Sequence, residues 1–158
     1  MVLSLNCLIL GQASDNCFTV DIGEKNHDDS DFEVEFSDFK VSHFKEKLFR
    51  EQIIKDKIRD KNEMNLWKVD SKKTNEEENN LKEFTISDIR EKLGGELMNP
   101  RFLLGKYFNE NSFKDEESKS AIHIIVVPIP TTTTGKCLPI FYPRTKIISL
   151  FCFLYIMY

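Results

Sequence analysis

The sequence lacks the cysteine and histidine patterns from which structural zinc sites are built. Its four cysteines include no CxxC pair, and none stands at a ligand spacing from one of the three histidines. We therefore expect no metal site and no cofactor. Cys7 and Cys17 both lie in apolar runs, where two arrangements are open: buried free thiols, or a disulfide across adjacent strands if the protein is secreted.

The sequence also lacks the motifs of catalytic and phosphate-binding sites. Gly135 and Lys136 follow four threonines without the first glycine of a phosphate-binding loop. The acidic runs 28–31 and 76–78 lack the fixed glycine and the terminal glutamate of a calcium loop. His123 stands in an apolar run, which is typical of a hydrogen-bonded core histidine. We expect no catalytic residue and no enzyme; a fragment of an enzyme is the third reading.

A charge excess of one sign is missing as well. The chain has 22 basic and 26 acidic residues, a net charge of −4, and the two signs alternate through its middle. Such a balance excludes a protein whose main task is to neutralise phosphates, so we expect no nucleic-acid partner. Hydrophobic residues make up 41% of the chain, which is enough for one packed domain with some length left over.

The N-terminus has no convincing cleavable signal peptide. Residues 1–10 are apolar, but no Lys or Arg precedes them and no A-x-A cleavage site follows. Their alternating pattern predicts a first strand with Leu3, Leu5, Cys7 and Ile9 on one face. A signal peptide is the alternative.

The C-terminus has an apolar run, but not a membrane span. Residues 147–158 carry no charge, whereas a spanning helix needs ~20 apolar residues. A truncated or mispredicted gene end is the first reading of this run. A weak contact with a membrane or a partner is the second.

The first half of the chain predicts strands around one helix. Residues 2–10 and 17–22 alternate on either side of turn-forming residues, as in a hairpin, and residues 32–36 suit a short extra strand. A helix is expected from Ser42, with its clearest stripe over residues 43–52. Residues 64–70 suit a strand with one buried face, and the charged residues 71–83 suit a loop.

The second half predicts two short helices and a buried strand. Thr85 and Asp88 resemble a capping pair, Gly94-Gly95 resembles a helix stop, and residues 100–108 have the cap and proline of a second helix. Residues 121–127 are apolar almost without interruption, as in a strand covered on both sides, and Pro128 ends the run.

This order predicts an α+β protein with a ubiquitin-like β-grasp fold. Its mixed sheet would carry one main helix and two short helices, with the last strand beside the first. The domain would cover residues 1–130. Residues 131–158 would form a tail that is disordered or is a truncated remnant.

Several segments together resemble the N-terminal header domain of Crinkler effectors, in its fungal form. The opening residues 1–11, the run 18–22, the helix 44–49 and the segments 93–97 and 100–108 carry part of the likeness. A segment in the place of the LxLFLAK-type translocation motif is formed by Leu66, Trp67, Lys68, Val69 and Asp70. An element resembling the closing HVLVVVP motif is formed by His123, Ile124, Ile125, Val126, Val127 and Pro128.

The resemblance implies a secreted, non-catalytic module that acts in host cells. Its partner would be a host-cell protein or the uptake machinery, and export would not need an obvious cleavable signal. The long C-terminal effector domain of full-length members would be missing here. Trp67 is expected in the core, or else as a contact for a translocation partner, and Lys68 is expected at the surface. An intracellular ubiquitin-like interaction module is the alternative function.

Overall fold

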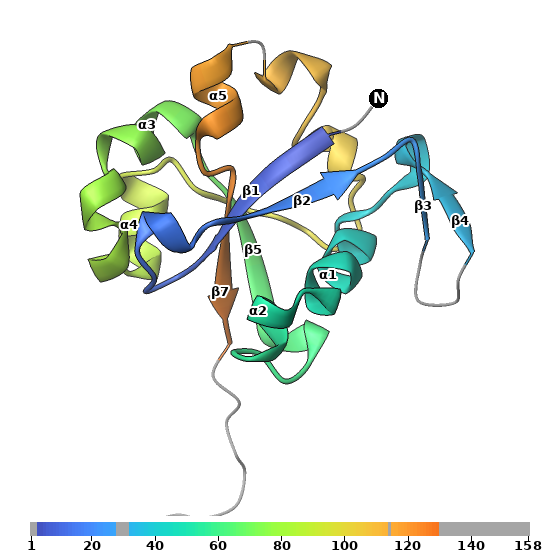
Figure 1. The fold of residues 1–158 in the computed structure, drawn as a ribbon, viewed down its shortest axis with the longest axis horizontal. Coiled ribbons are helices and arrows are strands. Elements are labelled where there is room, and N and C mark those ends of the chain that lie inside the picture. Colours follow the sequence, from blue (N-terminus) through green and yellow to red (C-terminus); the bar gives the residue numbers. More distant parts are fainter. Residues whose placement is uncertain (1–2, 28–31, 114, 130–158) are drawn as a thin grey trace, which may run out of the picture.

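The computed structural model describes residues 3–27, 32–113 and 115–129, and its centre is a mixed five-stranded sheet (Figure 1). The strand order is β2-β1-β7-β5-β6, with β7 parallel to β1 and antiparallel to β5. The strands are β1 (Leu3–Ile9), β2 (Phe18–Ile22), β5 (Met64–Lys68), β6 (Glu96–Leu97) and β7 (Ile124–Pro128). The predicted α+β, β-grasp-like fold is confirmed, as is the placement of the last strand beside the first. The predicted tail, residues 131–158, lies outside the described residues.

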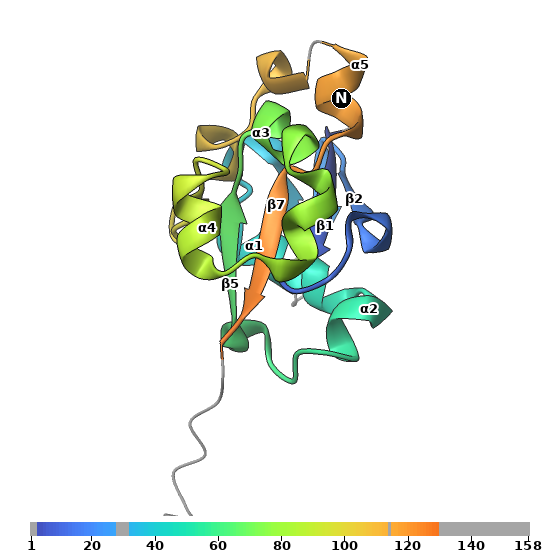
Figure 2. The same ribbon diagram turned by 90° about the vertical axis from the view of Figure 1, so that its left-hand side faces the viewer.

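The sheet has a hydrophobic core on each face. Helices α1 (Val41–Arg50) and α2 (Gln52–Lys55) cover one face, where Phe44 and Leu48 meet the alternate residues of β1. The short helices η4 (Glu78–Glu83) and α4 (Ile86–Glu91) cover the other. Figure 2 shows α4 in front of the strands and α1 behind them. The four residues predicted on one face of the first strand all lie in the first core.

Strand β5 is covered on both faces, which its own sequence pattern did not predict. Leu66 packs into the first core and Trp67 into the second, so the strand is covered on both faces. The expectation of one buried face is therefore wrong. Alternation showed which side chains oppose each other, but not that the face of Leu66 and Lys68 would be covered as well as the face of Trp67.

The segment expected as a loop, residues 71–83, is helical instead. It forms α3 (Ser71–Glu76) and η4. The Asp70 carboxylate accepts hydrogen bonds from the amides of Lys72 and Lys73 and so caps α3. Buried Thr74 and Leu81 attach the two turns to the second side of the sheet. Two anchoring residues in 13 are too few to produce a visible apolar period, which explains the wrong prediction.

The helix expected over residues 100–108 is also absent; only the 3₁₀ turn η5 (Leu104–Lys106) forms there. The carbonyls of Pro100 and Phe102 instead accept hydrogen bonds from the amides of Ser42 and Val41, at 3.0 and 2.9 Å. These amides belong to the first turn of α1, which begins at Val41 and not at Ser42 as expected. The segment therefore satisfies the main helix in place of forming its own.

A separate hairpin projects from the domain between β2 and α1 (Figure 1). It pairs β3 (Lys25–His27) with β4 (Glu33–Glu35), which confirms the short extra strand. The remaining elements are η1 (Ser14–Asn16), η2 (Phe36–Asp38), η3 (Lys61–Glu63), η6 (Glu110–Phe113) and α5 (Glu116–Ser120).

The predicted start and stop of α4 are confirmed. The Thr85 amide donates to the Asp88 carboxylate at 2.9 Å, and the Asp88 amide returns a bond to the Thr85 hydroxyl. After the helix, Gly94 has a φ of +61°, a left-handed conformation that favours glycine. The Gly95 amide then donates to the Ile89 carbonyl at 2.9 Å.

We expect Gly95→Ala to destabilise the domain by about 1–3 kcal/mol, the usual cost of overpacking. A Cβ at this position would lie 2.7 Å from the Ile89 carbonyl oxygen and 2.6 Å from its Cγ2. The matched control is Gly105→Ala, whose Cβ would meet nothing nearer than Phe36 at 4.0 Å. Chemical denaturation of both variants measures the difference. Equal stabilities would show that the turn after α4 can shift to accommodate a Cβ at no cost in stability.

Candidate functional site

The segment in the place of the translocation motif forms most of β5 and leads into α3. Its Leu66, Trp67 and Val69 side chains are buried, with Trp67 only 5% exposed, so the expectation of a core tryptophan is confirmed. Lys68 is partly exposed and Asp70 is exposed. These last two side chains are what the segment offers to a partner at the surface.

The segment that resembles the closing motif, His123 to Pro128, contains the central strand β7. The side chains of His123 to Val127 are all buried, and only Pro128 is partly exposed. The two segments pair directly, with Leu66 opposite Val126, Trp67 opposite Ile125 and Lys68 opposite Ile124. Two motifs far apart in the sequence are therefore neighbouring strands, and most of their residues build the two cores.

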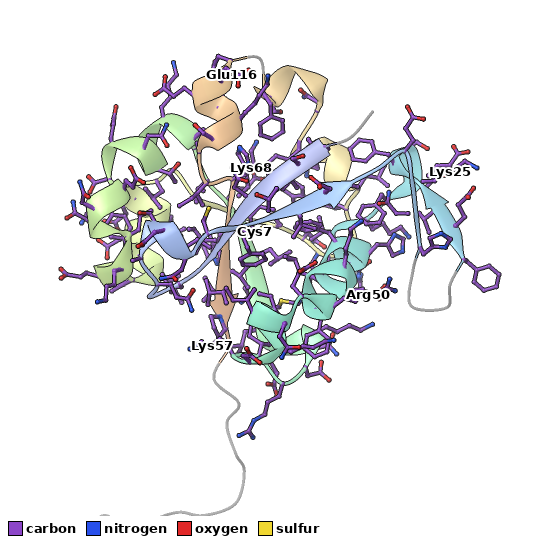
Figure 3. All side chains as sticks on the ribbon, viewed as in Figure 1. Cys7, Lys25, Arg50, Lys57, Lys68 and Glu116 are labelled. Carbon is purple, nitrogen blue, oxygen red and sulfur yellow. The ribbon has the colours of Figure 1, made fainter. Side chains whose placement is uncertain are left out.

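Lys68 lies at the end of β5 nearer to α5 (Figure 3). Its Nζ is 5.6 Å from the centre of the Phe108 ring, so its alkyl chain follows the first core while the ammonium reaches the surface. The predicted surface position is thus correct only in part. Asp70, in contrast, is already engaged as the cap of α3.

His123 is a fully engaged core histidine. Its Nδ1 accepts a hydrogen bond from the Asn6 backbone amide at 2.9 Å, so the ring proton is on Nε2. Nε2 donates to the Ser118 carbonyl at 2.7 Å. The Phe113 ring meets the imidazole edge-on. Burial lowers the pKa of His123 from its ordinary value of 6.5, although the Ser118 carbonyl acts in the opposite direction.

The sequence did not reveal Asn6, which completes this arrangement. Its side-chain amide donates to the carbonyls of Lys119 and Ala121, each at 2.9 Å, and its Oδ1 accepts from the Thr19 hydroxyl at 2.7 Å. Asn6 thereby ties the chain entering β7 to the first strand. A polar residue at a buried strand position was the available signal.

Folding stability is expected to fall as the pH drops below about 6.5 because of His123. A lowered pKa in the folded state means that the unfolded chain binds the proton first, so stability is complete above 6.5 and is lost on acidification. The limiting slope for one group is about 1.4 kcal/mol per pH unit. Denaturation between pH 7.5 and 5.5 measures it, and His123→Gln should flatten the profile. His27→Gln, at an exposed side chain, is the control. An unchanged slope in His123→Gln would assign the effect to another group.

The other side chains that could be reactive or bind a metal are either buried or far from one another. Cys7 and Cys17 are free; Cys7 is buried, as expected, but Cys17 is exposed. Burial raises the pKa of the Cys7 thiol far above its ordinary value, which keeps it protonated. Within the described part of the chain, no group of three His, Cys, Asp or Glu residues could hold a metal ion. No helix there is long and apolar enough to span a membrane.

One shallow depression of about 320 Å³ lies where the projecting hairpin joins the domain. It is lined by Glu24, Lys25, Glu35, Phe36 and Ser37. Two carboxylates, one ammonium, one hydroxyl and one phenylalanine ring line it, and no His or Cys is among the described residues of its lining, so it is a polar hollow at the surface.

Comparison with known families places most of the chain in one of them. Residues 3–127 match the Crinkler effector protein N-terminal domain, a range that runs from the first residue of β1 nearly to the end of β7. No curated protein and no solved structure matches the chain. Because the match covers well over half of the sequence, the chain belongs to the family of Crinkler effector N-terminal domains.

Proposed function

We propose that residues 1–130 form the delivery header of a secreted Crinkler-type effector, a module that brings the protein into host cells and has no catalysis of its own. The family match over residues 3–127 is the observation that carries this proposal. The matched range coincides with the sheet and its two cores, which supports a domain boundary near residue 130. In this proposal the segment 131–158 lies outside the folded domain.

Two features of the interior support binding over catalysis. Both ring nitrogens of His123 are used in hydrogen bonds to the backbone, so the imidazole has no free nitrogen for a substrate. The Cys7 thiol is buried and held protonated, whereas a cysteine nucleophile must be a thiolate. Both residues therefore serve the fold.

The proposed partner is a host-cell protein or part of the uptake machinery. Of the translocation-motif equivalent, Lys68 and Asp70 alone reach the surface to an appreciable degree, and Asp70 is occupied at the start of α3. Lys68 is consequently the residue through which this segment would recognise a partner.

Lys68→Ala is expected to leave the domain folded and to lower uptake into host cells about tenfold, the effect of losing about 1.4 kcal/mol in binding. Its loss of stability should stay below about 1 kcal/mol, because the side chain is partly exposed and its ammonium contacts the core through the Phe108 ring alone among the described aromatic rings. Uptake of the labelled full chain and its thermal melt are measured together. The matched control is Lys57→Ala, an exposed lysine at the opposite end of the domain (Figure 3).

Export and recognition are tested separately. A tagged full chain should appear in the culture fluid of the producing cell, whereas an intracellular ubiquitin-like adaptor would remain inside it; retention would refute the delivery role. If the protein is exported and Lys68→Ala enters host cells as well as the wild type, the motif contributes through folding alone.

A further inference from the structure

A basic and apolar patch surrounds the segment that caps α1. Phe102 and Leu103 are 41% and 43% exposed, although they stand in the middle of a folded, hydrogen-bonded segment. The patch consists of these two residues together with the exposed side chains of Lys40, Arg101 and Lys106. It is separate from the paired family motifs, whose side chains are mostly buried.

Contacts within the patch hold the cations beside the apolar side chains. The Lys106 Nζ lies 3.7 Å from the centre of the Phe102 ring. Lys40 and Leu103 are opposite each other in an isolated antiparallel bridge, which places their side chains as neighbours on the same side. Arg101 precedes Phe102 directly. Each of the two exposed apolar side chains thus has a lysine beside it, and Arg101 adds a third positive charge one residue away in the sequence.

The segment that carries the patch has no acidic residue of its own. Residues 97–109 contain no Asp or Glu, although the whole chain has 26 acidic residues in 158. The contacting turn η2 brings Asp38, and Glu35 directly precedes this turn, so three basic residues stand against two acidic ones. The patch is therefore locally positive in a chain of net charge −4.

The backbone presents these side chains in a fixed way. The carbonyls of Pro100 and Phe102 are held by the first amides of α1, and the Leu104 amide donates to the Phe39 carbonyl at 2.8 Å. Leu104 itself is fully buried and anchors the segment in the first core. Because the loop is already ordered, contact with a partner would cost little further conformational entropy.

We propose that this patch docks the domain on an anionic lipid bilayer. At such a surface, aromatic and aliphatic side chains enter the boundary between headgroups and acyl chains, while Lys and Arg meet the phosphate and carboxylate headgroups. Exposed apolar side chains with basic neighbours match both layers at once. The patch thus supplies a membrane contact that the delivery role proposed above would use, but its binding can be measured without any uptake.

The test is co-sedimentation of the full chain with vesicles containing roughly 30% phosphatidylserine in phosphatidylcholine, at low salt. The wild type should bind these vesicles and bind pure phosphatidylcholine vesicles much more weakly. Removing two charges in Arg101→Ala/Lys106→Ala should weaken binding about 25-fold, or about fivefold for each basic side chain. Phe102→Ser/Leu103→Ser should weaken it by at least about fivefold.

Two controls match these variants. Phe32→Ser removes an aromatic side chain that is 70% exposed, but on the projecting hairpin among acidic residues. Lys57→Ala/Arg59→Ala removes two exposed charges from the connection between α2 and η3, outside the patch. Both controls should bind vesicles as the wild type does, and circular dichroism should show all variants folded.

Equal vesicle binding by the wild type and both patch variants overturns the proposal, because binding would then reside elsewhere in the chain. Retention on polyglutamate with the same variant dependence, but without vesicle binding, would assign the patch to an acidic protein and also overturn it. Vesicle binding through the patch with no export of the protein would refute the delivery role and leave the membrane contact standing.

Discussion

Replacing Val126 with aspartate is expected to leave the domain unfolded or insoluble. Val126 has no exposed surface and lies on the central strand between Ile9 of β1 and Leu66 of β5. A carboxylate there would be surrounded by the first core, with no basic partner. Burying an unpaired charge costs several kcal/mol, which is comparable with the whole stability of ~5–15 kcal/mol of a small domain.

Asn65→Asp provides the matched control for this substitution. Asn65 lies on β5 opposite Val127, so the same negative charge enters the same pair of strands, but at an exposed side chain. We expect a change within about 0.5 kcal/mol for it. Circular dichroism and denaturation of both proteins decide the matter. A cooperative, wild-type melt of Val126→Asp would mean that β7 is at an edge, contrary to the observed strand order.

The strand order could be predicted largely because it depends on strong local signals. The apolar run of β7 is long enough to require cover on both faces, and the hairpin of β1 and β2 has alternation on both sides of a polar turn. The pairing of β7 with β5 had no such signal. Periodicity shows which face of a strand is buried, but it does not show which other strand lies beside it.

The wrong predictions occur where tertiary hydrogen bonds decide the local structure. Residues 100–108 have good helix signals. Their Pro100 and Phe102 carbonyls nevertheless accept hydrogen bonds from the first amides of α1, which would otherwise have no partner. In α3 the reverse holds, because a weak segment becomes helical through the Asp70 cap and the contact of Thr74 with the Ile122 carbonyl at 3.2 Å. Local propensity is a small term that such contacts override.

The same reasoning applies to the candidate site. The sequence indicated both family segments, the buried His123 and a core Trp67, but it did not indicate that the Lys68 side chain would lie beside the Phe108 ring. The patch at Phe102 was hidden for a particular reason. Residues 100–108 were predicted as a helix, whereas the segment forms a turn and a 3₁₀ turn in which Phe102 and Leu103 are exposed.

Asn6→Ala is expected to destabilise the domain by about 2–4 kcal/mol, although it removes only a small polar side chain. The side-chain amide of Asn6 satisfies two carbonyls, of which that of Ala121 is buried. Without the amide, both carbonyls and the Thr19 hydroxyl lose a partner. An unsatisfied buried acceptor costs about 1–3 kcal/mol, because its hydration is lost without replacement.

The loss should also be local in a recognisable way. The His123 backbone amide donates to the Asn6 carbonyl, and the Asn6 backbone amide donates to the His123 Nδ1. Together the two residues hold α5 and the entry to β7, so amide exchange near residues 118–123 should accelerate more than in the rest of the domain. Ser4→Ala is the matched control, since Ser4 lies two residues earlier on the same face of β1 and bonds Asp21 at an exposed site. It should cost no more than about 0.5 kcal/mol. If the two variants unfold at the same denaturant concentration, the two carbonyls must be satisfied by water when Asn6 is absent. The network would then orient the chain without stabilising it.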